Sequence, residues 1–387
     1  MFTSFTDAFG LRFALLNSLA SLNRFTSFTD AFGLRFALLS SLASLNRFTS
    51  FSRYFVNRRL VWIGLLLSFM VVSCSEYSAD SENNKSGGSR WIFPPPTSLS
   101  WSPDGGWIIF LEFSEMQLMK ADNTRDITPF SGTGQYTNPV WSPDGQKIAY
   151  VYAPRYLTSD IWVKLVHEDM APTRITSHKA NDASPSWSPD GTMIAFQSYR
   201  TGNWDIWLTT PDGSGSAIQF TMDSADDKNP VWSPDGSKIA FISNQDGSYD
   251  IWIKSYDGTE PPRQITNTSE YEENIRWSSD GQRIAYLDKS KSKSSIFVQN
   301  ISGSNSEIQI NTSGDISSYD WSPDGNFILY QAGDFIAGQR SDGMGEERQI
   351  AEGKEPIWSP DGQKIAYVKF DGERYIITIV DSPVEFK

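Results

Sequence analysis

The sequence predicts an all-β fold, a seven-bladed β-propeller of four-stranded antiparallel blades, from three observations. The pentapeptide Trp-Ser-Pro-Asp-Gly occurs six times, and a seventh copy has Ser279 in place of proline. The copies start at intervals of 40, 46, 45, 45, 44 and 37 residues, which is the length of one four-stranded blade. No segment between two copies has the length and apolar periodicity of a helix. The copies begin at Trp101, Trp141, Trp187, Trp232, Trp277, Trp321 and Trp358.

The fourth repeat shows how the elements follow one another. Proline presets φ in the turn from Ser233 to Gly236, and glycine takes the left-handed position. Asp257-Gly258 is a strong hairpin signal between the last two strands. The four strands are expected at 229–232, 238–242, 249–253 and 263–266. Such small sheets need neighbours to cover their faces, so the repeated tryptophans are interpreted as structural filler between blades.

Ring closure is expected to join the two ends of the domain. The last repeat offers three strands, at 356–358, 364–369 and 375–380, and leaves little room for a fourth. Arg90-Trp91-Ile92-Phe93 lies before Trp101 at the distance that separates a fourth strand from the next tryptophan in most other repeats. The sequence therefore predicts that this N-terminal strand completes the seventh blade.

These repeats resemble TolB-type propeller repeats, whose signature is Trp-Ser-Pro-Asp-Gly followed by Ile-Ala-Phe and Asp-Ile-Trp strands. The stretch from Trp187 to Phe196 with Asp205-Ile206-Trp207 matches the signature almost letter for letter, as does the following repeat. The resemblance covers about 90–387 and implies a propeller. The sixth repeat departs from it, with Asp334-Phe335-Ile336 in the third strand. TolB itself has an α/β domain before six blades, so its role in the cell envelope does not transfer whole.

The first 55 residues are dominated by a tandem duplication. Residues 2–24 and 25–47 differ only at Asn17 against Ser40. Such near-identity indicates recent duplication at the DNA level, or a reading frame upstream of the true start. Residues 1–55 are therefore interpreted as untranslated or not retained.

A lipoprotein signal peptide is expected at 56–73. Arg58-Arg59 precedes a thirteen-residue apolar run that is too short to span a bilayer. Val71-Val72-Ser73-Cys74 resembles the bacterial lipobox, which implies lipidation of Cys74, the only cysteine. Ser75 resembles the sorting signal for the outer membrane of Gram-negative cells. Residues 74–89 are polar and are expected to be a flexible tether.

Charge and composition argue against several functions. From Cys74 onward the chain has 26 basic and 44 acidic residues, a surface that would repel nucleic acid. His167 and His178 have no metal-ligand spacing to another His, Cys or Glu, and no Gly-x-Ser-x-Gly elbow occurs. No Asp-x-Asp-x-Asp-Gly calcium loop occurs either. No cofactor or metal is expected, and an enzyme is the less favoured class.

The variable loops opposite the Ser-Pro-Asp-Gly turns are the expected recognition surface, because they place aromatic side chains beside carboxylates and amides. The leading hypothesis is a lipid-anchored, monomeric propeller that binds a protein on the periplasmic side of the bacterial cell envelope or at the cell surface. A glycan or peptidoglycan module is the first alternative. A hydrolase or lyase using Asp226, Asp227, Glu272 and Glu273 is the second. The candidate contact residues are Arg155, Tyr156, His178, Asp182, Tyr199, Arg200, Trp204, Asp226, Asp227, Asp246, Tyr271, Glu272 and Tyr319.

Overall fold

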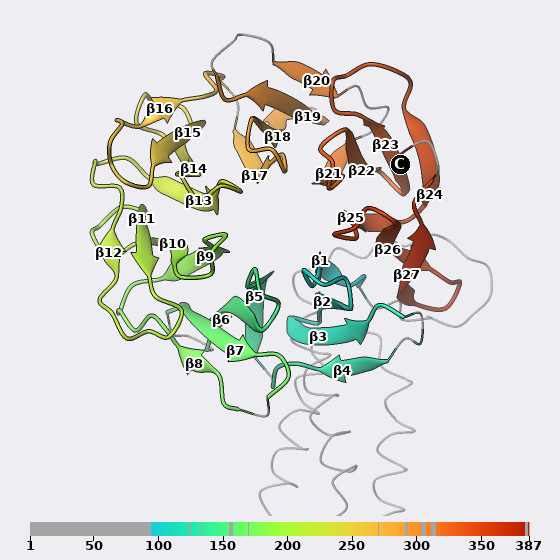
Figure 1. Ribbon diagram of the computed structural model, residues 1–387, viewed down its shortest axis with the longest axis horizontal. Coiled ribbons are helices and arrows are strands. Elements are labelled where there is room, and N and C mark those ends of the chain that lie inside the picture. Colours follow the sequence, from blue (N-terminus) through green and yellow to red (C-terminus); the bar gives the residue numbers. More distant parts are fainter. Residues whose placement is uncertain are drawn as a thin grey trace, which may run out of the picture. The chain divides into compact units, whose positions relative to one another are not determined.

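The computed structural model describes residues 94–387 apart from 123, 125, 133, 155–157, 169, 270, 291–292, 303–306, 311–314, 384–385 and 387. The described residues form 27 strands and no α-helix. The strands make seven antiparallel sheets arranged as blades around a ring (Figure 1). The predicted seven-bladed propeller is confirmed.

The strands follow the chain from the inside of each blade outward. Blade 1 contains β1 (Thr97–Trp101), β2 (Trp107–Glu112), β3 (Glu115–Lys120) and β4 (Ile127–Pro129). Blade 2 contains β5 (Gln135–Trp141), β6 (Lys147–Ala153), β7 (Asp160–Leu165) and β8 (Thr173–Arg174). Blade 3 contains β9 (Asp182–Trp187), β10 (Ile194–Ser198), β11 (Asp205–Thr209) and β12 (Ile218–Gln219). Blade 4 contains β13 (Asp227–Trp232), β14 (Lys238–Ser243), β15 (Asp250–Ser255) and β16 (Arg263–Gln264).

Blades 5 and 6 repeat this order, and the described part of blade 7 has three strands. Blade 5 contains β17 (Glu272–Trp277), β18 (Arg283–Ser290), β19 (Lys293–Asn300) and β20 (Ile308–Ile310). Blade 6 contains β21 (Ile316–Trp321), β22 (Phe327–Ala332), β23 (Phe335–Arg340) and β24 (Arg348–Glu352). Blade 7 contains β25 (Lys354–Trp358), β26 (Lys364–Phe370) and β27 (Tyr375–Asp381). These are the three strands expected there. The strand expected at 90–93 lies outside the described residues, so closure by it stays a prediction.

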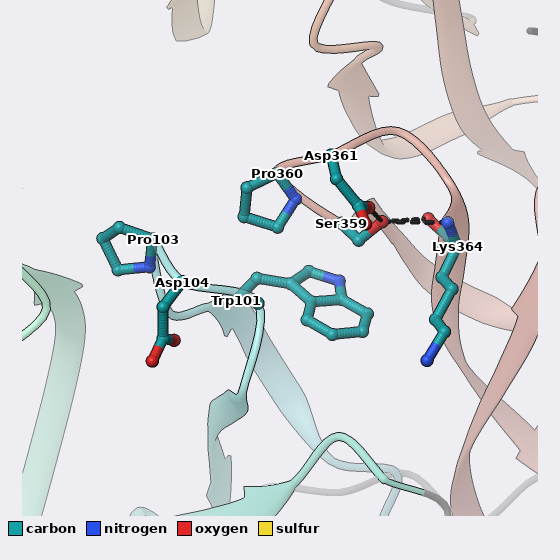
Figure 2. A pocket seen from close by; sticks show the side chains of 8 residues that line it. Trp101, Pro103, Asp104, Ser359, Pro360, Asp361 and Lys364 are labelled. Atoms are coloured by element: carbon teal, nitrogen blue, oxygen red, sulfur yellow. Dashed lines mark hydrogen bonds between the residues drawn. The ribbon is translucent and has the colours of Figure 1, made fainter.

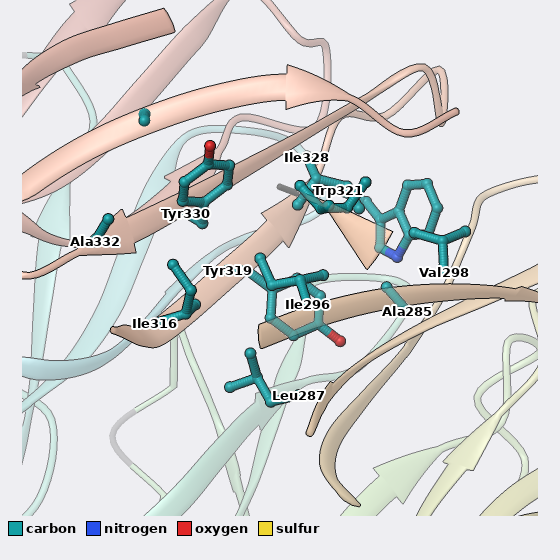
Figure 3. Packing of buried hydrophobic residues seen from close by; sticks show 12 residues of the cluster. Ala285, Leu287, Ile296, Val298, Ile316, Tyr319, Trp321, Ile328, Tyr330 and Ala332 are labelled. Atoms are coloured by element: carbon teal, nitrogen blue, oxygen red, sulfur yellow. The ribbon is translucent and has the colours of Figure 1, made fainter. Parts of the chain in front are cut away.

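The hydrophobic core is divided into seven clusters, one at each interface between neighbouring blades. Each cluster contains one repeat tryptophan, which confirms their interpretation as filler between blades. Figure 3 shows the cluster between blades 5 and 6, where Tyr319 and Trp321 face Ile296 and Val298. The cluster with Trp101 and Ile357 joins blade 1 to blade 7 and closes the ring.

Each residue of the Ser-Pro-Asp-Gly turn has a structural task. In blade 4 the Ser233 hydroxyl donates to Asp235 Oδ1 at 2.6 Å and accepts the Lys238 N–H at 3.0 Å. Asp235 Oδ1 also accepts the N–H of Ser237 at 3.0 Å. Gly236 has φ of 72°, a conformation that favours glycine, and it faces Pro189 of the preceding turn. Successive turns therefore contact one another around one end of the ring.

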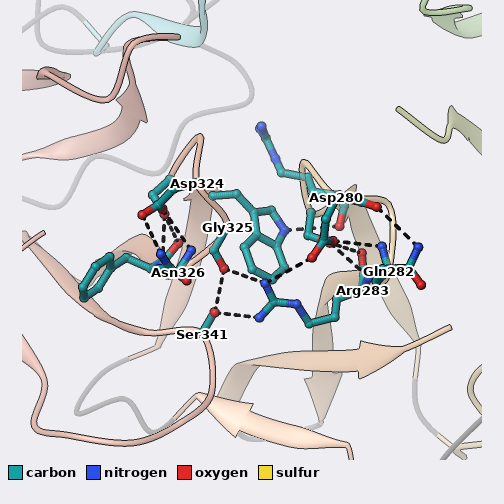
Figure 4. A network of polar contacts seen from close by, with 12 residues as sticks. Asp280, Gln282, Arg283, Asp324, Gly325, Asn326 and Ser341 are labelled. Carbon is teal, nitrogen blue, oxygen red and sulfur yellow. Dashed lines mark hydrogen bonds and ion pairs between the residues drawn. The ribbon is translucent and has the colours of Figure 1, made fainter. Parts of the chain in front are cut away.

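Blade 5 replaces the turn proline by Ser279, and Arg283 takes over its contact. Arg283 Nη2 donates to the Gly325 carbonyl at 2.7 Å and Nη1 donates to Ser341 Oγ at 2.9 Å (Figure 4). The guanidinium also lies 5.1 Å above the Trp321 ring. A side chain from β18 thus bridges blades 5 and 6 where the other turns use proline.

A β-bulge interrupts the innermost strand of each of the seven blades, and in six of them the backbone at the bulge is left-handed. The residue three positions before the repeat tryptophan has positive φ in all six: Ser98, Asn138, Ser184, Asn229, Asn274 and Glu355. The strand register shifts at the same place. The extra residue turns the side chain five positions before the tryptophan toward the interior. Without the bulge, strict alternation would instead turn inward the side chain four positions before the tryptophan.

Candidate functional site

Loops of blades 3, 4 and 5 bring aromatic side chains together on the face opposite the Ser-Pro-Asp-Gly turns. We call Tyr199, Trp204, Asp226, Lys228, Tyr249 and Tyr271 the aromatic ridge. Five of these side chains come from the loops between the second and third strands or from the connections between blades, and Lys228 is the second residue of β13. Tyr199 and Tyr271 are 47% and 41% exposed, and the other four are half-buried.

Two aromatic pairs form the ends of the ridge. Tyr199 and Trp204, from the β10–β11 loop, lie edge to face with ring centroids 5.5 Å apart. Tyr249 and Tyr271 make the same arrangement at 5.5 Å and join blade 4 to blade 5. Edge-to-face packing fixes the rings against one another, so less side-chain entropy is lost when a partner covers them.

Asp226 holds the two pairs together. Its Oδ1 accepts the backbone N–H of Trp204 at 3.1 Å, and its Oδ2 accepts the Tyr249 hydroxyl at 3.1 Å. Lys228 Nζ donates to the same Oδ2 at 2.8 Å and lies 4.8 Å above the Tyr249 ring. Burial raises the pKa of Asp226, but these hydrogen bonds outweigh burial and leave the pKa lowered. The ridge is therefore one connected unit with an ion pair at its centre.

Three acids expected among the exposed contact residues are instead buried. Asp182, Asp227 and Glu272 are each 0% exposed. They are the first residues of β9, β13 and β17, five positions before the repeat tryptophan, and the bulge turns them inward. The expectation that they lie on the surface is corrected for this reason. Asp227 and Glu272 lie directly beneath the ridge, since Asp226 precedes Asp227 and Tyr271 precedes Glu272.

Two of these acids have strongly altered proton affinity. Burial raises the pKa of Asp227 to about 7, and the Thr221 and Ser243 hydroxyls oppose the shift only in part. Neither oxygen of Asp227 makes a well-formed hydrogen bond within the described residues. Burial also raises the pKa of Glu272 to about 7, although Thr266 and Thr268 donate to its carboxylate at 2.6 and 2.9 Å.

Asp182 is held differently. Arg200 donates to its two oxygens at 3.0 and 3.2 Å and stacks on Trp207 at 4.5 Å. Arg200 is therefore a structural partner of Asp182, half-buried behind Tyr199 rather than part of the exposed ridge.

The remaining candidate contact residues do not join the ridge. Tyr319 is 1% exposed and is buried between blades 5 and 6, because it lies two positions before Trp321 and points inward like Pro230 in blade 4. His178 Nδ1 accepts the N–H of Ala180 at 3.2 Å. Asp246 is exposed and accepts a hydrogen bond from Gln264. Cys74, Arg155 and Tyr156 lie outside the described residues.

Lys228 and Tyr249 also belong to the candidate site, although they are not among the contact residues predicted from the sequence. A signal for both existed in the repeat pattern. Tyr249 directly precedes Asp250 of the Asp-Ile-Trp strand, as Trp204 precedes Asp205, and Lys228 directly follows Asp227. Residues beside an inward-pointing acid face outward on a strand, so these positions were open to prediction.

The four carboxylates considered for an enzyme are each ion-paired or buried. Asp226 is ion-paired with Lys228, and Glu273 is ion-paired with Lys289 at 2.8 Å. Asp227 and Glu272 are fully buried. Across the part of the chain that the structure describes, no group of three or more His, Cys, Asp or Glu side chains is placed to hold a metal ion.

The end of the ring that carries the turns has a small hollow between blades 1 and 7. It has a volume of about 280 Å³ and lies between Trp101, Pro103, Pro360 and Lys364 (Figure 2). The carboxylates at its rim are already bonded within their own turns; Asp361, for instance, accepts from Ser359 at 2.6 Å. The hollow is thus lined largely by polar groups that are held within the turns themselves.

Fold and motif define the class of protein: a seven-bladed β-propeller made of Trp-Ser-Pro-Asp-Gly repeats. Residues 94–274 match the family model of the TolB beta propeller domain. Over these residues the chain is similar to the TolB-type propeller domain, in agreement with the resemblance of its repeats. No curated protein matches the sequence.

Several solved structures share the fold. TolB from Acinetobacter baumannii is 23% identical with a TM-score of 0.51, over 67% of this chain and 65% of that one. The match thus spans less than two thirds of that TolB. An oligogalacturonate lyase from Vibrio parahaemolyticus is 15% identical with a TM-score of 0.59, over 74% and 89% of the two chains. Hydrazine synthase from Kuenenia stuttgartiensis is 14% identical with a TM-score of 0.57, over 78% and 100%. At these identities the similarity shows the fold alone.

Across the described part of the chain, no helix has both the length and the apolar character needed to cross a bilayer.

Proposed function

We propose that this protein is an exported, lipid-anchored propeller that binds another protein of the bacterial cell envelope through the aromatic ridge. The observation that supports this most is the connected arrangement of two exposed aromatic pairs around the Asp226–Lys228 ion pair. Aromatic side chains in fixed geometry supply apolar contact area at low entropic cost, and the ion pair supplies selectivity. The anchor is the lipid on Cys74, followed by the tether at 74–89.

The enzyme alternative has little support, because its four candidate carboxylates are either ion-paired or buried. A glycan or peptidoglycan ligand is the second candidate. The exposed rings of Tyr199 and Tyr271 favour it, because an aromatic face can stack on a sugar ring. Both candidates use the same residues, so one set of variants separates them by what is bound.

The test is cross-linking in living cells followed by purification of the full-length lipidated protein. The wild type is compared with the variant Tyr199→Ala/Trp204→Ala/Tyr271→Ala. A matched control is Phe335→Ala/Phe370→Ala, since these side chains are 42% and 39% exposed on blades 6 and 7. We expect one protein partner to be lost only in the ridge variant. A partner retained by the ridge variant would contradict the proposal.

The glycan candidate is tested with the same variants on purified peptidoglycan sacculi. The second candidate would replace the leading proposal under two conditions. The wild type and the control variant would sediment with sacculi while the ridge variant would not, and no protein partner would be found in cells. The anchor is tested separately with Cys74→Ser, which we expect to move the protein from the membrane to the soluble fraction. Membrane retention of that variant would contradict the lipid anchor.

A further inference from the structure

Three successive blade interfaces share a buried pair of acids beneath the loops of the same face. The first member opens the third strand of one blade, and the second opens the first strand of the next blade. The strands are tied at this point: the Asp182 N–H donates to the Ser159 carbonyl at 2.9 Å, and the Asp227 N–H to the Trp204 carbonyl at 2.7 Å. The pairs are Asp160 with Asp182, Asp205 with Asp227, and Asp250 with Glu272.

The first pair is neutralised by two arginines. Arg174 contacts Asp160 at 2.8 Å, and Arg200 contacts Asp182 at 3.0 Å. Two positive charges therefore lie against two buried carboxylates. This pair is an internal reference for the other two, because it has the same position in the fold.

The second pair has no arginine or lysine in an ion pair with it, within the described residues. Asp227 is faced by Asp205 and by Asp223, whose charges add to the raised pKa, and by the Thr221 and Ser243 hydroxyls. Asp205 accepts hydrogen bonds from the Thr201 hydroxyl, from Asn203 Nδ2 at 3.3 Å and from Gln219 Nε2 at 3.2 Å. All of these donors are neutral.

The third pair is also without an arginine or lysine ion pair among the described residues. Glu272 is faced by Asp250, by Thr266 and Thr268, and by the Ile251 N–H at 3.1 Å. Across the strand pairing it is opposite Asp288, and the Tyr286 phenol lies in the field of both acids. Asp250 accepts the Thr268 N–H at 2.9 Å and the Ser248 hydroxyl at 2.6 Å.

Four ridge residues are the direct chain neighbours of these two pairs. Trp204 precedes Asp205, Asp226 precedes Asp227, Tyr249 precedes Asp250 and Tyr271 precedes Glu272. Since neighbouring side chains on a strand point to opposite sides, a shift of a buried acid moves the ridge residue beside it.

We propose that Asp227 and Glu272, each buried opposite a second acid at a blade interface, act as a pH-sensitive latch, which holds the aromatic ridge in its binding arrangement while they are protonated and releases the ridge when they ionise. The inference rests on the proposed function of the ridge. It adds a regulation of that site by pH.

The physical reason is the cost of two negative charges in a dry interface. A carboxylate buried opposite a second acid, with no cation in an ion pair with it, lacks solvation and is repelled by its neighbour, whereas the protonated form avoids both costs. The raised pKa values of Asp227 and Glu272, about 7 for each, place this change near neutral pH. Because ionisation opens the latch, it is closed below about pH 7 and opens as the pH rises through that value.

The test follows backbone hydrogen exchange of the full-length protein at about pH 6 and about pH 8.5, corrected for the intrinsic exchange rate. Peptides spanning 199–206, 223–229, 246–252 and 271–274 report on the ridge, and a peptide spanning 158–163 reports on the reference pair. We expect protection of the ridge peptides to fall by at least about tenfold at the higher pH, the ratio that corresponds to one pKa unit. The reference peptide is expected to change little.

The variants Asp227→Asn and Glu272→Gln, made separately and together, copy the protonated state. We expect them to keep the ridge peptides protected at both pH values. Infrared spectroscopy provides a second readout: the wild type should lose a carboxylic acid band between the two pH values, and each variant should lose less. Equal changes in ridge and reference peptides, or an unchanged carboxylic acid band, would overturn the proposal.

These measurements need no partner, so they separate the two proposals. The variant Tyr199→Ala/Trp204→Ala/Tyr271→Ala is expected to lose binding but keep the carboxylic acid band and its pH dependence. If the pH response is observed but no partner is found, the latch stands and the proposed function is in error. If a partner binds the ridge equally at both pH values, the proposed function stands and the latch is in error.

Discussion

The ring of Phe386 packs directly against Gly338, in the place that an aliphatic side chain of the third strand takes in the other six blades. A Cβ added at Gly338 would lie 2.8 Å from the Phe386 ring. By strand register the equivalent residues are Leu118, Val163, Leu208, Ile253, Val298 and Ile379. Phe386 is 6% exposed and also packs edge to face on Phe327 at 5.0 Å. The C-terminal segment thus replaces a missing core side chain between blades 6 and 7.

This contact predicts a compensating pair of substitutions. Phe386→Ala should lower the free energy of unfolding by about 3 kcal/mol, because it removes a buried aromatic ring. Gly338→Val alone should also destabilise, since its side chain would collide with Phe386. The double variant should recover part of the loss, because valine then fills the space. Denaturant unfolding of all four proteins measures the coupling, and additive effects of the two substitutions would refute the replacement.

The bridge made by Arg283 gives a second prediction. Arg283→Ala should lower the free energy of unfolding by about 1–3 kcal/mol, because it leaves the Gly325 carbonyl and Ser341 without a charged donor. Ser279→Pro, which restores the proline of the other turns, should offset part of that loss. Thermal melting of the single and double variants provides the measurement. Arg340→Ala is a matched control, since Arg340 is exposed and pairs only with the nearby Asp342. Equal losses for Arg283→Ala and Arg340→Ala would refute the bridge.

Stability should pass through a maximum between about pH 4 and pH 5, because two sets of acids act in opposite directions. Hydrogen bonds from Ser233 and from the N–H of Ser237 lower the pKa of Asp235 to about 2, so this contribution is present above pH 3.8 and is lost as the pH falls toward 2. The raised pKa values of Asp227 and Glu272 work the other way. Their contribution is present below about pH 4 and is lost as the pH rises toward 7.

Melting temperatures measured across this range check both the loss of stability toward acid pH, the acid limb, and the loss toward neutral pH. Asp227→Asn/Glu272→Gln should flatten the loss above pH 5 and leave the acid limb unchanged. Ser233→Ala should weaken the acid limb only. If the melting temperature of the Asp227→Asn/Glu272→Gln variant falls above pH 5 as steeply as that of the wild type, other groups cause the loss of stability.

Closure of the ring by residues 90–93 is tested by deletion. Removing 88–95 should abolish the cooperative unfolding transition, because blade 7 would lose its outer strand and its link to blade 1. Deleting 78–85 in the tether is the matched control and should leave the transition intact. Full cooperative melting after loss of 88–95 would rule out this closure.

The repeated motif made the architecture predictable because each of its residues has a local task. Ser233, Asp235 and Gly236 build a turn from contacts within a few residues, so the same letters give the same geometry at every copy. The strands of blade 4 accordingly start and end within two residues of their predicted bounds. The sequence also singled out Tyr199, Trp204 and Tyr271 as aromatic residues in variable loops, and their role in recognition stays a prediction.

The side of the sheet on which an acid lies was not predictable in the same way. Asp227 and Glu272 were expected at the surface, but the bulge at Asn229 and Asn274 adds one residue and reverses the alternation before it. Only the tertiary structure shows that Arg200 reaches Asp182, that Arg283 reaches the next blade, and that Phe386 reaches Gly338. Turns and strands are specified by neighbours in the chain, whereas these contacts join residues that are far apart in the sequence. The sequence by itself therefore determined the ring of blades, and the packing between blades decided which charges are buried and which side chains stay exposed.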